Sequence, residues 1–178
     1  MKKSIFTIGL LFLLFVLFFA AVSKPIKLTV TSPVFKNGEM IPVKYTCKDE
    51  DISPEINWSG APKTTKSFVL ICDDPDAPMG TWVHWVVYNI PANVKKLQEG
   101  FPKDTELKNG IKQARTSFGK SGYGGPCPPS GTHRYFFKVY AINKILTLAP
   151  QKSDKNSVLK AIQGSIVGYG ELMGKFGK

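Results

Sequence analysis

The stretch SFVLICDDPDAPMGTWVHWVVYNI, residues 67–90, carries the strongest indication of the fold. Two apolar runs in it, Ser67 to Asp73 and Val83 to Ile90, have the length and β-branched content of buried strands. Between them, Pro75 and Pro78 fix φ and remove amide donors, so this segment is a stiff turn rather than part of a strand or helix. We therefore expect two strands joined by a rigid connection.

Both histidines of the chain lie in segments that are rich in turn residues. The first segment carries Asp74 and Asp76 on the stiff turn, and His84 follows at the start of the next strand. The second segment, GPCPPSGTHRY at residues 125–135, leads to His133 at the start of another predicted strand. The two segments together predict one site.

The loop before the second histidine has an unusual composition. From Ser117 to Gly131 it contains five glycines and three prolines. Glycine lets a backbone approach a ligand closely, so such a loop leaves amides open to bind one. The strand that follows is expected from His133 to Ile142.

Strands are predicted far more often than helices after residue 24. Ile26, Leu28 and Val30 alternate with polar residues, which places the apolar set on one face of a sheet. Turn-rich segments separate the predicted strands. The pattern predicts a mainly β fold, an antiparallel sandwich. Further strands are expected at Ile41 to Tyr45 and at Ile56 to Trp58.

A helix is expected near the C-terminus, with Ser153 or Asp154 as its N-cap. Glycines at positions 164, 168 and 170 each cost roughly 1 kcal/mol relative to alanine in a helix interior. Tertiary packing must therefore hold this helix. Its apolar face would consist of Leu159, Ile162, Ile166, Tyr169 and Met173.

The chain divides into an N-terminal segment and one domain. Residues 5–22 are eighteen residues without a charge, preceded by Lys2 and Lys3 and followed by Ser23. Residues 1–23 are thus expected to be a signal peptide or a membrane anchor, and cleavage is favoured by the small residues near position 23. Residues 24–178 are long enough for a single domain. We expect it to be exported, periplasmic or extracellular, or anchored to the membrane.

The chain is basic, with a formal net charge of +11. Loss of residues 1–23 would remove Lys2 and Lys3 and leave about +9. The lysines are scattered and never form a run, which indicates a solvated basic surface. No nucleic-acid partner is expected.

Three cysteines, an odd number, leave two arrangements open: one disulfide with one free thiol, or three free thiols. Cys72 alternates within an apolar strand and is expected to be a small core residue. Cys127 could be read as a nucleophile with His133 as its base, but the sequence places no third orienting group. We favour a structural role for Cys127 in a tight turn.

Together these segments resemble the phosphatidylethanolamine-binding protein family, also called Raf kinase inhibitor-like proteins, and most closely its bacterial and archaeal branch. The resemblance covers nearly all of residues 26–178. Its motifs are Asp74-Pro-Asp-Ala-Pro78, Trp82-Val-His84, Gly125-Pro-Cys-Pro-Pro-Ser-Gly-Thr-His-Arg-Tyr135, Tyr45-Thr-Cys47 with residues 52–60, and the ending Glu171-Leu-Met-Gly-Lys-Phe-Gly177.

This resemblance implies a Greek-key-like β-sandwich of two antiparallel sheets, with a C-terminal helix and small peripheral helices. It also implies a small anion pocket at one end, which in the family binds phosphate, acetate or phosphorylated headgroups. The connection Met79-Gly-Thr81 is short where animal members carry an insertion, which makes kinase regulation a less favoured role. The resemblance implies a pocket lined by Asp74, Asp76, His84, His133 and Tyr135, with Gly125 and Pro126 in its wall.

The residue chemistry is compatible with such a pocket. Two imidazoles and a phenol supply donors for an anion, whereas the carboxylates need another role. We hypothesise that Asp74 orients and charges His84, while Asp76 holds the loop through backbone amides. Anion affinity should then fall as the pH rises past the histidine pKa values.

Neighbouring residues have simpler expected roles. Trp82, Trp85 and Phe136 are expected in the core rather than against a ligand. Arg134 follows His133 and so points to the opposite sheet face, where a salt bridge or a rim position is expected.

Three classes of function remain, in this order. The first is a non-enzymatic binding protein for a small anionic or phosphorylated ligand, a class that includes lipid headgroups. The second is an inhibitor or regulator of a protease or kinase through protein contact. The third, a hydrolase or metal site, lacks HExxH spacing and a GxSxG elbow, so neither a metal nor a cofactor is expected.

Overall fold

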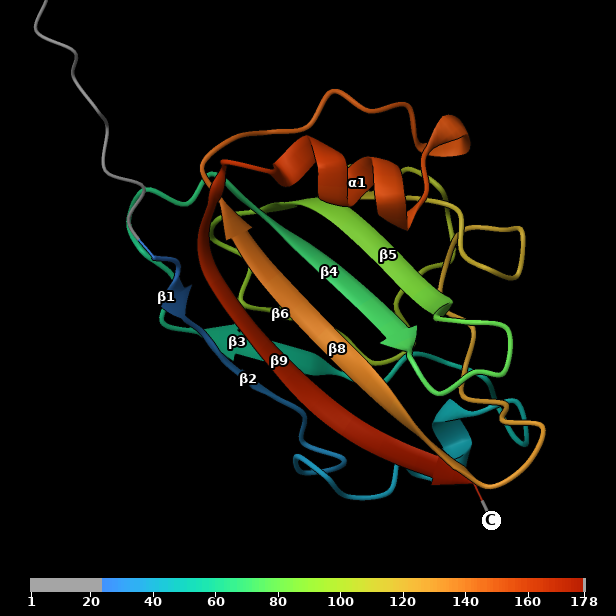
Figure 1. Ribbon diagram of the computed structural model, residues 1–178. Helices are drawn as coiled ribbons and strands as arrows, with labels where there is room; N and C mark the ends of the chain where they lie inside the picture. The colour runs from blue at the N-terminus through green and yellow to red at the C-terminus, as the bar shows by residue number, and fades with distance from the viewer. Residues whose placement is uncertain (1–23, 178) are drawn as a thin grey trace, which may run out of the picture.

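The computed structural model describes residues 24–177, which form two sheets packed face to face and one helix (Figure 1). The predicted signal peptide or anchor, residues 1–23, lies outside the described residues. Within residues 24–177, no helix combines the length and apolarity needed to cross a bilayer.

The larger sheet has six strands in the order β1-β9-β8-β4-β5-β7. Its neighbours pair antiparallel, except for β1, which runs parallel to β9. The strands are β1 (Ile26–Lys27), β4 (Ser67–Asp74), β5 (Trp82–Pro91), β7 (Lys112–Gln113), β8 (Thr132–Ile142) and β9 (Ile166–Gly177).

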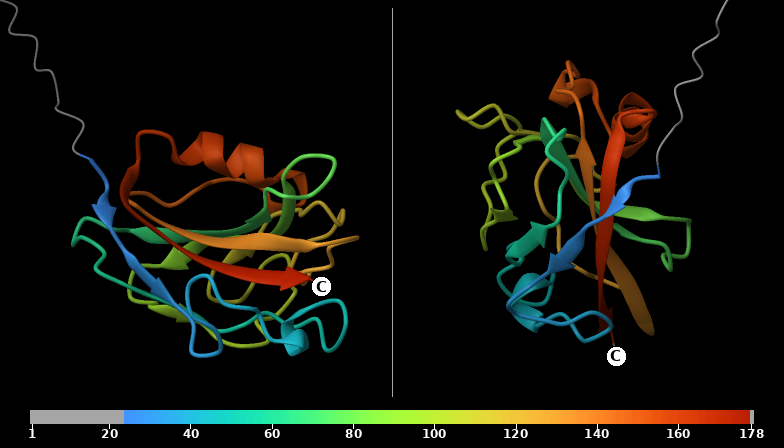
Figure 2. Two further views of the ribbon diagram at one scale, coloured as in Figure 1. Left: turned by 60° about the horizontal axis from the view of Figure 1, so that its bottom comes forward. Right: turned by 90° about the vertical axis from the view of Figure 1, so that its left-hand side faces the viewer.

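The smaller sheet has three antiparallel strands in the order β2-β3-β6. Figure 2 shows it below the larger sheet, with the helix on the opposite side. Its strands are β2 (Thr29–Thr31), β3 (Ile56–Ser59) and β6 (Lys96–Leu97), and the helical elements are η1 (Val43–Tyr45), η2 (Pro150–Lys152) and α1 (Lys155–Ile162).

Two apolar cores follow from these layers. The main core lies between the sheets and includes Trp58, Phe68, Trp85 and Phe137, all almost fully buried. A second core lies under α1, on the outer face of the larger sheet. Strands β4 and β5 contribute side chains to both cores, which explains why their sequences are apolar at consecutive positions rather than at alternate ones.

The predicted mainly β sandwich is confirmed, as are the strands that carry the two motifs. The prediction at residues 41–45 is wrong, because Pro42 cannot donate to a ladder and the chain turns into η1. The alternation at residues 26–30 holds only in part. Leu28 and Val30 are buried, but Ile26 is half exposed because the chain passes from the larger sheet to the smaller one between β1 and β2.

The predicted C-terminal helix is only partly right. Asp154 caps α1 through the Ser157 amide at 2.8 Å, as expected, but α1 ends at Ile162. Gly164, at φ +69°, turns the chain. Ile166, Tyr169 and Met173, expected on the helix, lie instead on β9.

Glycines on β9 explain this outcome. A Cβ at Gly170 would lie 2.4 Å from the Leu28 carbonyl oxygen, and one at Gly174 would lie 2.5 Å from the Ile41 side chain. The glycines therefore let β9 approach the segment that crosses between the sheets, which a strand with larger residues at these positions could not do.

Gly170→Ala should destabilise the fold by about 1–3 kcal/mol, because the added methyl group meets backbone that has little room to move. Urea unfolding would measure the change, with Glu171→Ala, at the exposed neighbouring position, as the control. Equal stability of the two variants would contradict close packing at Gly170.

Candidate functional site

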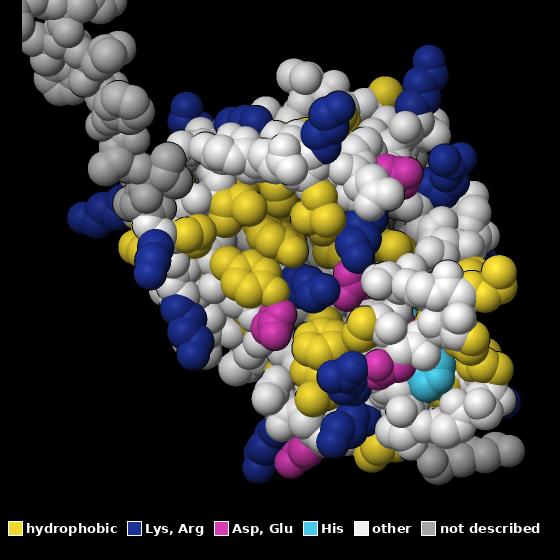
Figure 3. Space-filling model, in the orientation of Figure 1, with side chains coloured by type: hydrophobic (Ala, Val, Ile, Leu, Met, Phe, Trp, Pro, Cys, Tyr) yellow, Lys and Arg dark blue, Asp and Glu magenta, His cyan; other side chains and the backbone are white. Residues whose placement is uncertain are grey.

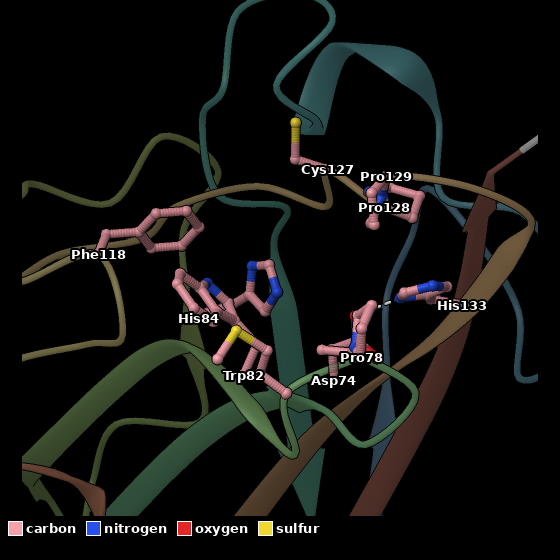
Figure 4. A pocket seen from close by; sticks show the side chains of 11 residues that line it. Asp74, Pro78, Trp82, His84, Phe118, Cys127, Pro128, Pro129 and His133 are labelled. Carbon is pink, nitrogen blue, oxygen red and sulfur yellow. Dashed lines mark hydrogen bonds and ion pairs between the residues drawn. The ribbon is translucent and has the colours of Figure 1, made fainter.

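A cavity of about 380 Å³ opens where the β4–β5 turn meets the loop before β8 (Figure 4). His84 and His133 lie on opposite sides of it, with Asp74 between them. The structure thus brings the two sequence motifs together, as expected. The lining residues are Asp74, Ala77, Pro78, Met79, Trp82, His84, Phe118, Cys127, Pro128, Pro129 and His133.

Asp74 joins the two motifs. It ends β4 and is 3% exposed. One carboxylate oxygen, Oδ2, accepts a hydrogen bond from His133 Nδ1 at 2.7 Å, and Oδ1 accepts one from the Asp76 amide at 2.8 Å. The hypothesis that Asp74 orients His84 is therefore wrong: the antiparallel register of β4 and β8 brings this carboxylate to His133 instead.

His84 is oriented by the backbone. Its Nδ1 donates to the Gly124 carbonyl oxygen at 2.7 Å. The ring packs edge-on against Phe118 and Tyr135, at centroid distances of 5.4 and 5.2 Å. Burial lowers the pKa of His84, although the Gly124 carbonyl and the Asp74 charge act in the opposite direction. His84 is therefore neutral until the solution is more acidic than an ordinary histidine requires.

Asp76 fixes the turn to β8. Its carboxylate accepts from the Arg134 amide at 2.9 Å and from the Arg134 guanidinium at 2.9 and 2.7 Å. These contacts lower the pKa of Asp76 to about 2. The predicted bond to a backbone amide and the predicted salt bridge of Arg134 are both present, and Asp76 itself does not line the cavity.

Tyr135 lies beneath the cavity rather than in its wall. The side chain is fully buried, and its hydroxyl forms no hydrogen bond of normal geometry with the described residues, although the Cys127 amide interacts with it electrostatically. Burial raises the pKa of this phenol, so it stays protonated. Its observed contact is with the His84 ring.

Gly125 and Pro126 support the wall instead of lining it. The Gly125 amide donates to Asp51 Oδ1, and a Cβ at Gly125 would lie 2.5 Å from the Tyr45 carbonyl oxygen. The Pro126 carbonyl accepts from the Cys47 amide at 3.1 Å. The next three residues, 127–129, form the wall of the cavity itself.

A disulfide between Cys47 and Cys127 holds this wall to the segment after η1. Of the two arrangements left open, the structure has one disulfide and one free thiol. Cys72 is buried in the main core, as expected, and burial raises its pKa. The nucleophile interpretation of Cys127 fails because its sulfur is bonded.

Comparison with known proteins agrees with this fold. Residues 31–177 match the family described as phosphatidylethanolamine-binding protein. The chain belongs to the phosphatidylethanolamine-binding protein family.

Relatives of this family member occur in bacteria and archaea. It is 53% identical over 150 residues to a UPF0098 protein of Aquifex aeolicus, with 83% of this chain and 86% of the relative covered. A UPF0098 protein of Methanothermobacter thermautotrophicus is 46% identical over 142 residues, with 80% and 93% covered.

Solved structures of the family are also similar to this chain. The Chlamydia trachomatis phosphatidylethanolamine-binding protein homolog CT736 matches with a TM-score of 0.78 and 38% identity, covering 85% of this chain and 98% of that one. Escherichia coli YbcL, described as a member of the mammalian family, matches with a TM-score of 0.79 and 35% identity over the same shares.

In this family member, an apolar rim that the sequence analysis missed surrounds the two imidazoles. Met79 is 97% exposed, Phe118 40% and Trp82 37%, and the Trp82 and Phe118 rings touch edge-to-face at 5.5 Å. Trp82 was wrongly expected in the core, whereas Trp85 is there, and Phe136 is half-buried on the outer sheet face. The sequence does contain a signal for this rim, because large apolar residues stand beside prolines and glycines in two of the predicted loops.

No cluster of three or more potential metal-ligating side chains occurs among residues 24–177. Around the cavity, Asp74 and His133 bond each other, and Nδ1 of His84 bonds a carbonyl. The arrangement thus offers one Nε2 atom from each imidazole, the nitrogen that its Nδ1 contact leaves for a ligand.

The Asp76–Arg134 pair should make stability depend on acidity. The folded pKa of about 2 lies below the unfolded value, so the contribution is complete above about pH 4 and is lost as the pH falls toward 2. Because the side chains are 28% and 51% exposed, we expect only about 1 kcal/mol.

Asp76→Asn should therefore be less stable than the wild-type protein near neutral pH and nearly equal to it at about pH 2, by urea unfolding. Asp104→Asn, at an exposed carboxylate, is the control. A stability difference that is the same at both pH values would contradict this role.

Proposed function

We propose that the protein is a non-enzymatic binding protein whose cavity holds a small anionic or phosphorylated group. One observation carries the proposal: two imidazoles, each anchored through Nδ1, lie on opposite sides of one cavity. Anchored rings are pre-organised donors once they are protonated, so little orientational entropy is lost when an anion binds between them.

Unpaired carboxylates at Asp74 and Asp76 would repel an anion in the cavity. Both carboxylates, however, have hydrogen-bonding partners. Asp74 is bonded to His133 and to the Asp76 amide, and Asp76 is bonded to Arg134. Each negative charge thus lies beside a group that offsets it when the imidazole is protonated. An anion in the cavity would meet the histidines first.

The apolar rim favours an anion that carries an apolar or amphipathic group over a bare ion. Met79, Trp82 and Phe118 would contact whatever is attached to the anionic end. In a phosphorylated headgroup, the phosphate would lie between the imidazoles and the group esterified to it would lie against the rim.

The absence of turnover is part of the proposal. Apart from Cys127, whose sulfur is in the disulfide, the residues that line the cavity carry neither a hydroxyl nor a thiol. Among these described residues, the imidazoles therefore have no nucleophile to activate.

We also propose that the protein acts beyond the cytoplasmic membrane. The disulfide supports this, because such bonds persist in oxidising compartments. The basic, apolar N-terminal sequence supports it too. A second candidate function, inhibition of a protease or kinase, is supported by the exposed Met79, which is placed to contact a protein partner.

The proposal is tested by NMR titration of the protein with inorganic phosphate and then with phosphoethanolamine. Saturable shifts confined to residues around the cavity are expected, with tighter binding of the larger ligand. His133→Ala should weaken binding at least tenfold. Lys108→Ala, at an exposed cation elsewhere, should leave it unchanged.

Absence of shifts at millimolar ligand would refute the anion cavity and favour the inhibitor alternative. In that case the apolar rim would be tested next, by screening Met79→Ser against proteases that the wild-type protein inhibits.

Anion affinity should depend on pH through His84. Its lowered pKa means that the protonated ring, the better donor, forms only below the ordinary histidine range, so affinity should rise as the pH falls from about 8 to about 5. Sulfate is the appropriate probe because its charge is constant over this range. Calorimetric titration of wild type and His84→Gln would measure the effect, and a flat wild-type profile would contradict it.

A further inference from the structure

Part of the outer face of the larger sheet is uncovered. Helix α1 packs on β4, on β5 and on Ile142 at the end of β8, and Tyr140 and Ile166 pack against the edge of that core. The other outward side chains of β8 and β9 have no covering element among residues 24–177. Figure 3 shows apolar side chains gathered there, below the helix, with lysines around them.

At the end of these strands nearest to the N-terminus, the uncovered face forms a groove. Its apolar part is made by Tyr140, Ile166 and Tyr169, and the two phenol rings are in contact at a centroid distance of 5.0 Å. Lys24, Pro25 and Lys27 complete the lining. We call these six residues the tyrosine–lysine groove.

The groove lies on a face with an excess of positive charge. Lys24 and Lys27 are exposed. Among residues 24–177, neither lysine forms a hydrogen bond or ion pair with an acidic side chain. Nearby, Lys138 and Lys155 share the single carboxylate of Asp73, at 2.7 and 2.5 Å, so one cation of that cluster is not neutralised. Glu171 is the acidic residue of β9 beside the groove, and it accepts a hydrogen bond from Tyr169.

The position of the groove in the chain is the second observation. The uncharged stretch of residues 5–22 ends two residues before Lys24. Two residues span at most about 7 Å. If that stretch is inserted in a bilayer, the groove lies within this distance of the lipid headgroups, with no spacer to hold it away.

We propose that the tyrosine–lysine groove is a membrane-docking surface that takes an anionic lipid bilayer. Tyrosine rings with an apolar body and a polar tip are favoured at the headgroup level. Lysines beside them bind anionic headgroups while their aliphatic stems lie along apolar surface. This surface is separate from the histidine cavity, and the proposal does not depend on the ligand of that cavity.

A second copy of the chain is a weaker candidate for this surface. An isologous contact would bring the basic groove of one copy, with Lys24 and Lys27, against the same basic groove of the other copy, and like charges repel. An anionic bilayer complements them instead, so charge favours lipid.

The test uses the full chain in nanodiscs, with an environment-sensitive fluorophore on one engineered cysteine. Ile166→Cys places the probe in the groove, and Thr31→Cys places it on an exposed position of the smaller sheet. Nanodiscs of mixed phosphatidylglycerol and phosphatidylcholine are compared with phosphatidylcholine alone. A blue shift with a roughly twofold gain in intensity is expected at position 166 with phosphatidylglycerol, and no change at position 31.

A charge variant tests the chemistry of docking. The double variant Lys24→Gln/Lys27→Gln should lower the ratio of docked to undocked protein roughly tenfold. Added salt should lower the same ratio in the wild-type protein. The control Lys108→Gln/Lys120→Gln removes two exposed lysines elsewhere on the molecule and should have little effect.

Three results would overturn the proposal. The first is equal probe signals at positions 166 and 31, and the second is an equal response to neutral and anionic discs. The third is a shift at position 166 that appears without lipid and grows with protein concentration, which would identify a second copy as the occupant. Near-UV circular dichroism confirms that each variant is folded.

Discussion

The close approach of β9 to the segment that crosses from β1 to β2 is the constraint on which the fold depends. A Cβ at Gly168 or Gly170 would meet Leu28, and one at Gly174 would meet Ile41, at distances that real contacts do not show. With only hydrogen atoms there, β9 can pair with β1 on one edge and β8 on the other. Strand β8 is thereby held between β9 and β4, and it is β8 that carries His133 to the cavity.

The site is a consequence of strand ends rather than of a single loop. β4 ends in Asp74, β5 begins just before His84, and β8 begins just before His133, so three rigid elements position the polar groups. The loops supply what the strands cannot: a carbonyl for His84 and an apolar rim. Polar groups fixed by strand ends thus lie beneath an apolar rim that is carried largely by loops.

The sequence was sufficient for the strands at residues 67–74, 82–91 and 132–142, because long apolar runs between prolines and glycines permit few alternatives. The predicted C-terminal helix was too long because Leu159, Ile162 and Ile166 satisfy helical spacing. The alternating glycines of β9 were interpreted as a free-energy cost to that helix rather than as a sign of a strand. The partner of Asp74 could not be predicted, because the choice between two histidines depends on strand register. The pairing of Cys47 with Cys127 could not be predicted either, because the two cysteines lie 80 residues apart in the sequence.

Strand β8 is long enough to place the start of the described chain and the histidine cavity at opposite ends of the sandwich. His133 stands near one end of this strand, and Ala141, near the other, is linked through Gly168 of β9 to Ile26 of β1, where the described chain begins. Eight residues of antiparallel strand extend over about 27 Å. Whatever precedes Lys24 is thus attached at the end of the sandwich remote from the histidines. A side chain at the end of the sandwich where the described chain begins therefore cannot contact the histidines, so the two ends are sterically independent.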